Sequence, residues 1–572
     1  KTAPPAADTG KVWDELIRSR ALVLDEMASR HHAASTGEGP EVAALAQALS
    51  AARTRLSALV VRGPDSQGEE DYSTEMAKAE EDKERAERNL AEKSVAFRAE
   101  LAGIRRGLPE VAAALSPESA LVAYVEYKQS PKLPLPRSGS SLPKPIRSYL
   151  ALILRPGLPR PILIPLGPAT RIETLIREWK SALAAEPMGL SRPGSRAEAR
   201  YRDMGSRLRK AVWDPLVGSL GKASMVFIVP DGALSLVSLA ALPTGKSAYL
   251  VESGPLMHYL STERDLAPGP SERPAGKGLL VMGGPDFDAL RAESVPGEEV
   301  MIAESTGGTG SEGKDERQLY RNPPGTCEDL QTLRFSPLPG SAEEASDIQS
   351  LWIRTSGEGN GSREIATKLT GPDATETSFK RRASGYRVLH LATHGFFLES
   401  HCPSTLHNAR TSAGERFHGG REAPAILGEN PLLLSGLALA GANRRQAFVP
   451  EAEDGMLTAE EITSLNLSGV EWAVLSACET GVGQVMAGEG VLGLRRAFKV
   501  AGAKTLIMSL WKVGDETSRE WMRNLYEGRR RGLPTAEAVR NASLEMIKSR
   551  RSRNQSTHPF FWGAFVAAGD WR

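Results

Sequence analysis

The stretch Val470-Glu471-Trp472-Ala473-Val474-Leu475-Ser476-Ala477-Cys478-Glu479-Thr480-Gly481 decides how this chain is expected to fold. Its apolar, β-branched run has the length of a buried strand, and Gly481 and Gly483 end it. We therefore expect Cys478 where a strand gives way to a tight turn at the edge of a sheet. A buried, unreactive cysteine at a strand end would show the same pattern, so this stretch alone leaves both interpretations open.

A second stretch, Tyr386-Arg387-Val388-Leu389-His390-Leu391-Ala392-Thr393-His394-Gly395, places a histidine in the same way. The carboxyl ends of strands in an open α/β sheet converge on one crevice, so residues far apart in the chain can meet there. A thiolate is a far better nucleophile than a thiol, so a catalytic cysteine needs a base nearby. The matched positions predict His394 as the base and Cys478 as the nucleophile. The amides of Gly395 and Cys478 are the predicted oxyanion hole.

The composition is that of an ordinary soluble globular protein. With 572 residues the chain is too long for one core, and about three domains are expected. Lys plus Arg (71) nearly cancel Asp plus Glu (70), so bulk charge favours neither nucleic-acid nor membrane binding. The three cysteines have no metal-ligand spacing and fit a reducing, cytoplasmic compartment. The chain begins at Lys1 rather than at a methionine, so a targeting signal or further domain upstream stays open.

The pattern along the chain predicts a helical region followed by two α/β blocks. Residues 1–113 show helical periods typical of a long hairpin or of the end of a repeat region. From 114 to 275 strands alternate with helices, which favours an α/β domain, and no catalytic group is apparent there. Residues 276–572 repeat the α/β pattern and hold both candidate catalytic residues. In this block Ser341 is the predicted N-cap of a helix, with Glu344 as its capping-box partner.

The spacing of the histidines and the absence of the common cofactor motifs bear on metal and cofactor binding. His390 and His394 lie four residues apart, which on a strand is roughly 13 Å, too far to share one ion. His390 is therefore interpreted as a core histidine with satisfied hydrogen bonds. The sequence contains no GxxxxGK[ST], HExxH or GxSxG motif. Neither a metal ion nor an organic cofactor is predicted.

Four motifs resemble the CHAT domain family in order and spacing: His394-Gly395, Leu475–Gly481, Gly488-Glu489-Gly490 and Ser509-Leu510-Trp511-Lys512-Val513-Gly514-Asp515. CHAT domains are caspase-like peptidases of clan CD, similar to separase and the caspases, and usually follow tetratricopeptide repeats. The resemblance implies a caspase-like αβα sandwich with a cysteine–histidine dyad. It also implies that residues 114–275 form a degenerate pseudo-caspase half and residues 276–572 the active half.

The resemblance further implies a cysteine endopeptidase that cleaves a partner protein. It suggests a role in bacterial defence or cell-death signalling, for example gasdermin activation, with an upstream repeat domain or an activator protein as a further partner. Asp515 looks like the position of separase's acidic residue in the pocket for the side chain before the cut, which would favour Arg or Lys. Glu479 and Trp511 would wall that pocket. Two alternatives stay open: Asp515 as a helix cap, and a catalytically silent caspase-like scaffold or sensor.

Overall fold

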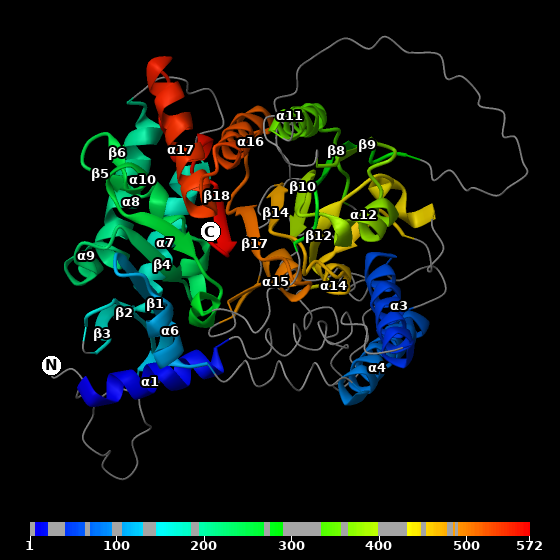
Figure 1. The fold of residues 1–572 in the computed structure, drawn as a ribbon, viewed down its shortest axis with the longest axis horizontal. Coiled ribbons are helices and arrows are strands. Elements are labelled where there is room, and N and C mark those ends of the chain that lie inside the picture. Colours follow the sequence, from blue (N-terminus) through cyan, green and yellow to red (C-terminus); the bar gives the residue numbers. More distant parts are fainter. Residues whose placement is uncertain are drawn as a thin grey trace, which may run out of the picture.

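The computed structural model describes residues 6–20, 40–62, 69–93, 106–129, 145–158, 160–184, 194–267, 275–289, 333–355, 364–397, 432–447, 453–477, 484–486 and 490–572. Within them one eleven-stranded sheet crosses the molecule in the order β3-β2-β1-β4-β7-β18-β17-β14-β10-β8-β9 (Figure 1). Neighbouring strands are parallel except in the pairs β1–β2, β2–β3 and β17–β18. The fold is therefore mixed α/β with a large, mostly parallel sheet.

The strands of this sheet come from both α/β blocks of the sequence. They are β1 (Ser119–Gln129), β2 (Ile146–Leu154), β3 (Ile162–Pro168), β4 (Met225–Val229), β7 (Leu256–Tyr259), β8 (Leu279–Pro285), β9 (Ala366–Gly371), β10 (Val388–Ala392), β14 (Trp472–Ser476), β17 (Thr505–Ser509) and β18 (Phe565–Gly569). The two blocks join through β7 and β18, whose pairing has a single register pair, Tyr259 with Ala568. Since the last strand of the chain completes this join, the sheet is continuous across residue 275.

Helices cover both faces of the sheet (Figure 1). On one face lie α7 (Ala169–Ala184), α8 (Arg196–Val212), α11 (Pro339–Thr355), α16 (Asp515–Arg530) and α17 (Thr535–Ser552). The other face carries α6 (Leu108–Ala114), α14 (Ala459–Ile462) and α15 (Leu494–Val500). Further short helices are α9 (Asp214–Leu220), α10 (Leu250–Ser253), α12 (Glu376–Arg382) and the 3-10 turns η1 (Gly232–Leu236), η2 (Leu239–Ala241), η3 (Glu263–Leu266), η5 (Ala383–Gly385), η7 (Ala442–Ala447) and η8 (Pro559–Phe561).

Side chains of β1 show why both faces need cover. Ala120, Val122 and Tyr124 belong to the core beneath α7 and α8, whereas Leu121 and Ala123 belong to a separate core with α6. Successive residues of a strand point to opposite faces, so an uninterrupted apolar run can be buried only between two layers of helices. Because both faces of the sheet are buried, the strands are continuous apolar stretches in the sequence.

A small sheet lies beside the carboxyl end of β10. Its strands are β11 (Gly395–Phe397), β12 (Ser435–Ala438) and β13 (Met456–Thr458), paired antiparallel in that order. Two further hairpins are formed by β5 (Pro243–Thr244) with β6 (Ala248–Tyr249), and by β15 (Gln484–Met486) with β16 (Gly490–Leu492). The chain thus leaves β10 directly into β11, with only two residues between them.

The amino-terminal helices dock on different parts of the molecule. α1 (Ala6–Ser19) packs through Trp13 and Ile17 on the core beneath β1 and β2. α3 (Pro40–Arg62) and α4 (Glu69–Lys93) form a hairpin that packs instead on the second block. The hairpin is tied to α14 by Glu460, whose carboxylate lies 3.4 Å from both Arg53 and Lys83.

The predicted strands around the two candidate catalytic positions are confirmed by β10 and β14. The capping prediction for α11 is wrong, because the helix begins at Pro339 and Ser341 lies inside its first turn. There the Ser341 hydroxyl accepts from the amide of Gly284 and donates to the carbonyl of Leu338, and Glu344 bonds to His390. The division into domains at 113 and 275 stays a prediction. None of the helices in the described ranges is long and apolar enough to cross a bilayer.

Candidate active site

His394 lies at the carboxyl end of β10, where the neighbouring strand β14 also ends. The two strands are parallel, and Ala392 pairs with Ser476 as the last residues of both. His394 follows Ala392 by two positions, and Cys478 follows Ser476 by two positions. Cys478 and Glu479 lie outside the described residues, as do the other two cysteines, Cys327 and Cys402.

The His394 ring is buried between two aromatic side chains. Its exposed fraction is 2%, and its centroid lies 5.3 Å from that of Phe287 and 5.5 Å from that of Phe335. Nε2 lies 2.8 Å from the carbonyl oxygen of Ser336. Since a carbonyl can only accept, Nε2 carries the proton, and Nδ1 of the neutral ring is the nitrogen that can act as a base.

Asn443 holds both flanking aromatic residues from the opposite side. Its side-chain amide accepts from the Phe335 amide at 2.8 Å and donates to the Phe335 carbonyl at 3.0 Å. Its backbone amide donates to the Phe287 carbonyl at 2.9 Å. A single residue of η7 thus fixes the two segments that sandwich His394.

The backbone amide of Gly395 points away from its partner strand. In the ladder between β11 and β12, Ala438 donates to the carbonyl of His394 at 3.0 Å, so Gly395 and Leu437 form a non-hydrogen-bonded pair. In such a pair the N–H groups face outward from the ladder. The Gly395 amide is therefore directed to the outer edge of β11, and its role in an oxyanion hole stays a prediction.

Ser509 positions the end of β14. This residue ends the adjacent strand β17, is fully buried, and donates its hydroxyl to the carbonyl of Ala477 at 2.6 Å. Ala477 immediately precedes Cys478, so the hydrogen bond fixes the carbonyl of the last described residue before the cysteine. The corresponding bond near the histidine runs from the Thr393 hydroxyl to the Ala438 carbonyl, at 2.5 Å.

Asp515 and Trp511, the described members of the predicted specificity pocket, are both buried. Asp515 is the first residue of α16 and follows the N-cap Gly514, so it is not itself the N-cap. Its carboxylate lies against Gly340 in the first turn of α11, where an added Cβ would be 2.2 Å from Oδ2. The Trp511 indole packs edge-on against Trp179 of α7, with centroids 5.9 Å apart. Their predicted roles in substrate binding stay predictions.

His390 is a core histidine, as its strand position predicted. The ring is fully buried, with Nε2 2.8 Å from a carboxylate oxygen of Glu344 and Nδ1 3.2 Å from the hydroxyl of Tyr526. Both ring nitrogens are occupied by groups of α11 and α16. His390 therefore ties two helices to β10 and does not join His394.

Three carboxylates near β13 have the spacing of a metal site. Ligand atoms of Glu376, Glu453 and Glu461 lie within 4.8 Å of one another. The ammonium of Lys380 lies 2.8, 2.7 and 2.9 Å from these three carboxylates. The ammonium of Lys380 thus occupies the position in which a metal ion would bind. The cluster is better explained as a buried ion-pair network.

Several residues of the site carry no motif that sequence reasoning could use. Phe335 and Ser336 contact His394, and Phe287 and Asn443 support it, but they come from three separate segments without a pattern. Ser509 begins the motif Ser509–Asp515, and its position at the end of a predicted strand could have indicated that it lies at this edge of the sheet.

Comparison with known proteins gives one family and two curated relatives. The CHAT domain matches residues 202–570. Tetratricopeptide repeat protein 28 of Mus musculus is 31% identical over 236 residues, covering 41% of this chain and 9% of that protein. Its Homo sapiens counterpart is 31% identical over 120 residues, covering 21% of this chain and 5% of that protein. The chain spans less than a tenth of the length of these relatives.

Two solved structures show more distant likeness. A chain of the Saccharomyces cerevisiae separase–securin complex aligns with a TM-score of 0.42 and 8% identity, over 91% of this chain and 36% of that one. The Arg-specific cysteine proteinase gingipain R of Porphyromonas gingivalis aligns with a TM-score of 0.33 and 9% identity, over 70% of this chain and 74% of that one.

Proposed function

The chain belongs to the CHAT domain family, and from this membership we propose that it is a cysteine endopeptidase in which His394 activates Cys478. The observation that carries the proposal is the register of β10 and β14. Their last residues, Ala392 and Ser476, pair side by side. His394 and Cys478 each follow by two positions, so we expect both to leave the sheet at the same edge.

The chemistry follows from the groups around His394. Nδ1 takes the proton of the Cys478 thiol, and the thiolate attacks the carbonyl carbon of the scissile peptide bond. The oxyanion accepts hydrogen bonds from the amides of Gly395 and Cys478. The protonated histidine then gives its proton to the leaving amine, and water hydrolyses the acyl-enzyme. The Ser336 carbonyl keeps Nε2 protonated and so maintains the tautomer that this sequence requires.

The substrate proposed is a partner protein, cut after a basic residue. Asp515 supports this preference as a buried carboxylate that an Arg or Lys side chain would pair with, and Glu479 and Trp511 would form the walls. A partner in bacterial defence or cell death, such as a gasdermin, and an upstream repeat or activator protein remain part of the proposal. No metal or cofactor is needed for the steps above.

A second candidate function is a silent scaffold or sensor with this fold. The observation that favours it is the 2% exposure of His394, which leaves little room for a substrate between Phe287 and Phe335. The same burial of His394 also fits a latent peptidase whose active site an activator exposes. A latent peptidase would cleave protein once activated, whereas a scaffold would not.

The test compares lysates and a diverse peptide library treated with the wild-type chain or with Cys478→Ala. The proposal expects new peptide termini with the wild-type chain that are absent with the variant, and a basic residue before the cut. Identical products from both proteins would rule out the peptidase and leave the scaffold.

A further inference from the structure

A charged cavity lies at the join between the two α/β blocks, away from His394. It has a volume of about 240 Å³ and opens beyond the carboxyl ends of β7 and β18. The charged side chains that line it are Asp265, Arg495, Lys499, Lys504, Asp570 and Arg572. Four cations thus face two carboxylates, an excess of two positive charges. The inference drawn from this cavity does not rest on the proposed peptidase activity.

Arg495 is the unusual member of the lining. Its exposed fraction is 8%, and in the part of the chain that the structure describes it makes one hydrogen bond, from Nη2 to the carbonyl of Leu260 at 3.3 Å, and no ion pair. Burial lowers the pKa of this guanidinium to about 10, because the nearby charge of Asp265 offsets the desolvation only in part. A guanidinium has five N–H donors, so most of those of Arg495 are left for solvent or a ligand in the cavity.

The nearest carboxylate is already committed to other groups. Asp265 accepts from Lys499 Nζ at 2.6 Å and from the amides of Ser261 and Thr262 at 2.8 and 3.1 Å. These bonds hold Asp265 in η3, and its charge compensates that of Arg495 only in part. An unpaired buried charge is costly, and proteins normally neutralise it.

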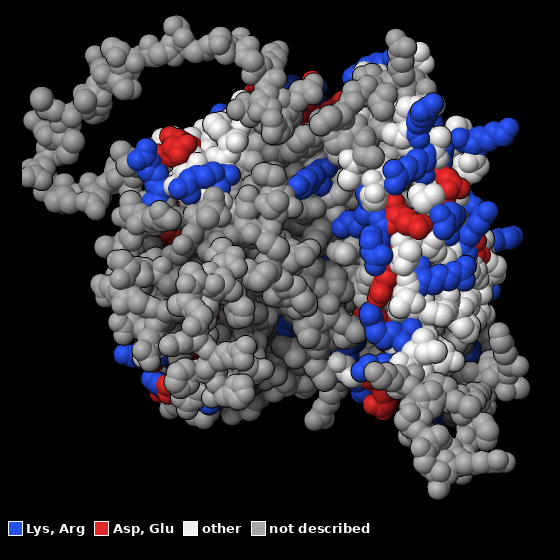
Figure 2. Space-filling model, turned by 180° about the vertical axis from the view of Figure 1, so that it is seen from behind, with Lys and Arg blue, Asp and Glu red and all other residues white. Residues whose placement is uncertain are grey.

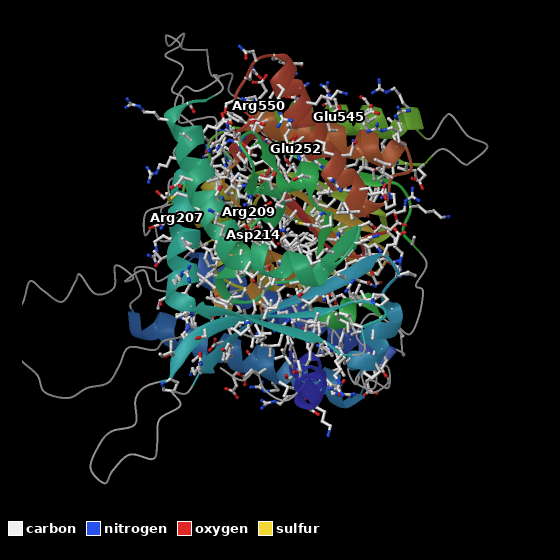
Figure 3. The ribbon with its side chains drawn as sticks, turned by 90° about the vertical axis from the view of Figure 1, so that its left-hand side faces the viewer. Arg207, Arg209, Asp214, Glu252, Glu545 and Arg550 are labelled. Atoms are coloured by element: carbon white, nitrogen blue, oxygen red, sulfur yellow. The ribbon has the colours of Figure 1, made fainter. Side chains whose placement is uncertain are left out.

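Two arginines elsewhere on the molecule show the pairing that Arg495 lacks within the described ranges. Figure 2 shows basic and acidic side chains intermixed on the described part of the rear face. Among the residues labelled in Figure 3, Arg209 lies 2.9 Å from Asp214, and Glu252 pairs with the neighbouring Arg551 at 2.5 Å. Arg495 is more buried than Arg209 and Arg551 and makes no ion pair with the described residues, in a position where a partner would contribute more.

We propose that this cavity binds the phosphate group of a small phosphorylated molecule, with Arg495 as the principal ligand and Lys499 and Lys504 beside it. A guanidinium presents its donors in a planar fork that matches two oxygens of a phosphate. The excess of two positive charges suits a dianion better than a monocarboxylate. A volume of about 240 Å³ is slightly below the ~300 Å³ at which pockets for drug-sized ligands begin, which fits a compact ligand.

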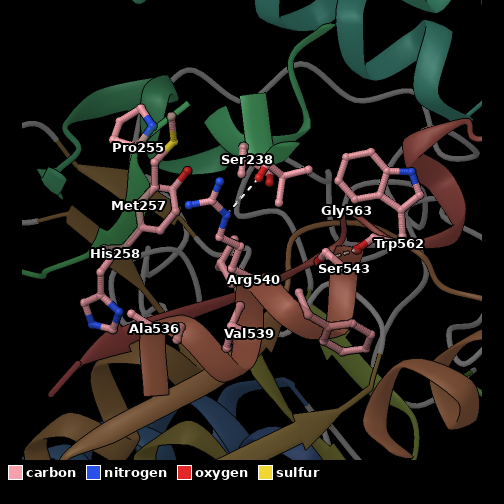
Figure 4. A pocket seen from close by; sticks show the side chains of 16 residues that line it. Ser238, Pro255, Met257, His258, Ala536, Val539, Arg540, Ser543, Trp562 and Gly563 are labelled. Atoms are coloured by element: carbon pink, nitrogen blue, oxygen red, sulfur yellow. Dashed lines mark hydrogen bonds between the residues drawn. The ribbon is translucent and has the colours of Figure 1, made fainter. Parts of the chain in front are cut away.

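The chain provides a matched control in Arg540 of α17. Like Arg495, Arg540 bonds to backbone carbonyls and to no carboxylate among the described residues: it donates to those of Val251 at 2.9 Å and Gly254 at 3.2 Å, and burial lowers its pKa. Figure 4 shows it among Ser238 and Met257 in a mainly apolar cavity. That cavity measures about 40 Å³, room for only a few waters.

The experiment is calorimetric titration of the full chain with inorganic phosphate, pyrophosphate or acetate, near neutral pH and at matched ionic strength. We expect saturable binding of phosphate and pyrophosphate but not of acetate. Arg495→Gln should weaken phosphate binding by about tenfold or more, the loss of one charged hydrogen-bonded contact. Arg540→Gln should leave it unchanged. Equal affinities in Arg495→Gln and the wild-type chain, or weakening by Arg540→Gln alone, would overturn the proposal.

Stability separates a ligand-binding arginine from a structural one. If Arg495 serves to bind a ligand, the thermal midpoint of Arg495→Gln in chloride should equal or exceed that of the wild-type chain. Phosphate should raise the thermal midpoint of the wild-type chain but not that of the variant. A variant that unfolds in chloride would assign Arg495 a structural role and contradict the proposal. The exposed Lys504→Gln provides a second check that leaves the fold intact, and it should weaken phosphate binding several-fold; unchanged affinity would count against the site as drawn.

Discussion

Ala392 of β10 and Ser476 of β14 are register partners in adjacent parallel strands, and each is the last residue of its strand. This one pairing fixes the relation between two catalytic candidates that are far apart in the chain. A shift of one residue would turn the side chains of one strand to the opposite face, so the register is strongly specified where both faces are buried. Because β10 and β14 are fully buried, His394 and Cys478 are expected to emerge together.

The first prediction concerns the reactivity of Cys478. If His394 draws off the thiol proton, His394→Asn should slow alkylation of Cys478 by iodoacetamide at about pH 7. A free thiol of pKa ~8.5 is only a few per cent ionised there, so the expected loss is about 30-fold. The rate should recover as the pH approaches 9. Peptide mass spectrometry reads each cysteine separately, and Cys327 and Cys402 serve as internal controls. Equal alkylation of Cys478 in both proteins would show that no dyad forms.

The second prediction concerns Ser509 as a positioning residue. Ser509→Ala removes the hydroxyl that donates to Ala477 and should lower kcat about tenfold with little change in KM, while Ser509→Thr should restore most of it. Thr505→Val is the control, because Thr505 lies at the other end of β17 and donates to the Asp570 carbonyl at the same 2.6 Å distance. Both substitutions should cost about 1 kcal/mol of stability. A similar fall in kcat for both would mean that the effect is only structural.

Features that depend on the pattern within one segment could be predicted from the sequence, whereas features that depend on contacts between distant segments could not. The strands β10 and β14 were predictable because each apolar run is short and is followed by glycine, which favours a buried strand over a buried helix. The position of Glu344 was not, because a capping box and a hydrogen bond with His390 can use the same residue type and differ only in tertiary contacts. The neighbours of His394 could not be predicted either, because Phe287, Phe335 and Asn443 come from separate segments and are brought together only by tertiary packing.

The third prediction links the amino-terminal hairpin to the site. Leu56 and Leu59 of α3 share a buried cluster with Phe287 and Phe335, the rings that enclose His394. Leu56→Ala should destabilise the chain by about 2–4 kcal/mol and also lower the alkylation rate of Cys478, because the rings lose part of their support. Leu49→Ala is the control, since Leu49 is buried in a separate cluster with Val42. An unchanged alkylation rate in Leu56→Ala would separate the hairpin from the site.

The fourth prediction decides between two roles of Asp515. If its carboxylate receives the side chain before the cut, Asp515→Asn should reduce the preference for Arg or Lys over Ala by about tenfold or more, through KM and kcat together. If it serves only the amino ends of α11 and α16, the variant should keep its preference and lose about 0.5–1 kcal/mol of stability. Cleavage of matched peptides, alongside thermal unfolding, distinguishes the two results.

The fifth prediction concerns pH and the acidic network beside β13. Burial, with the charge of Glu461 nearby, raises the pKa of Asp454 from 3.8 to about 8. The folded chain therefore keeps a proton that the unfolded chain releases, and the stability due to this site is lost as the pH rises from about 4 through about 8. Asp454→Asn is neutral at every pH and can still accept from the Met456 amide, as Asp454 does at 2.8 Å. Its thermal midpoint should match that of the wild-type chain near pH 4.

Near pH 8.5 the Asp454→Asn variant should be more stable than the wild-type chain by on the order of 1 kcal/mol, because the ionised wild-type carboxylate is then repelled by the charges of Glu461 and Glu453, which Lys380 offsets only in part. Asp373→Asn is the control, since Asp373 is exposed and lies nearby in the turn after β9. Thermal unfolding from pH 4 to 8.5 measures the difference. A constant offset between variant and wild type over this range would show that Asp454 does not carry the proton, and that the repulsion within the network is relieved at another carboxyl.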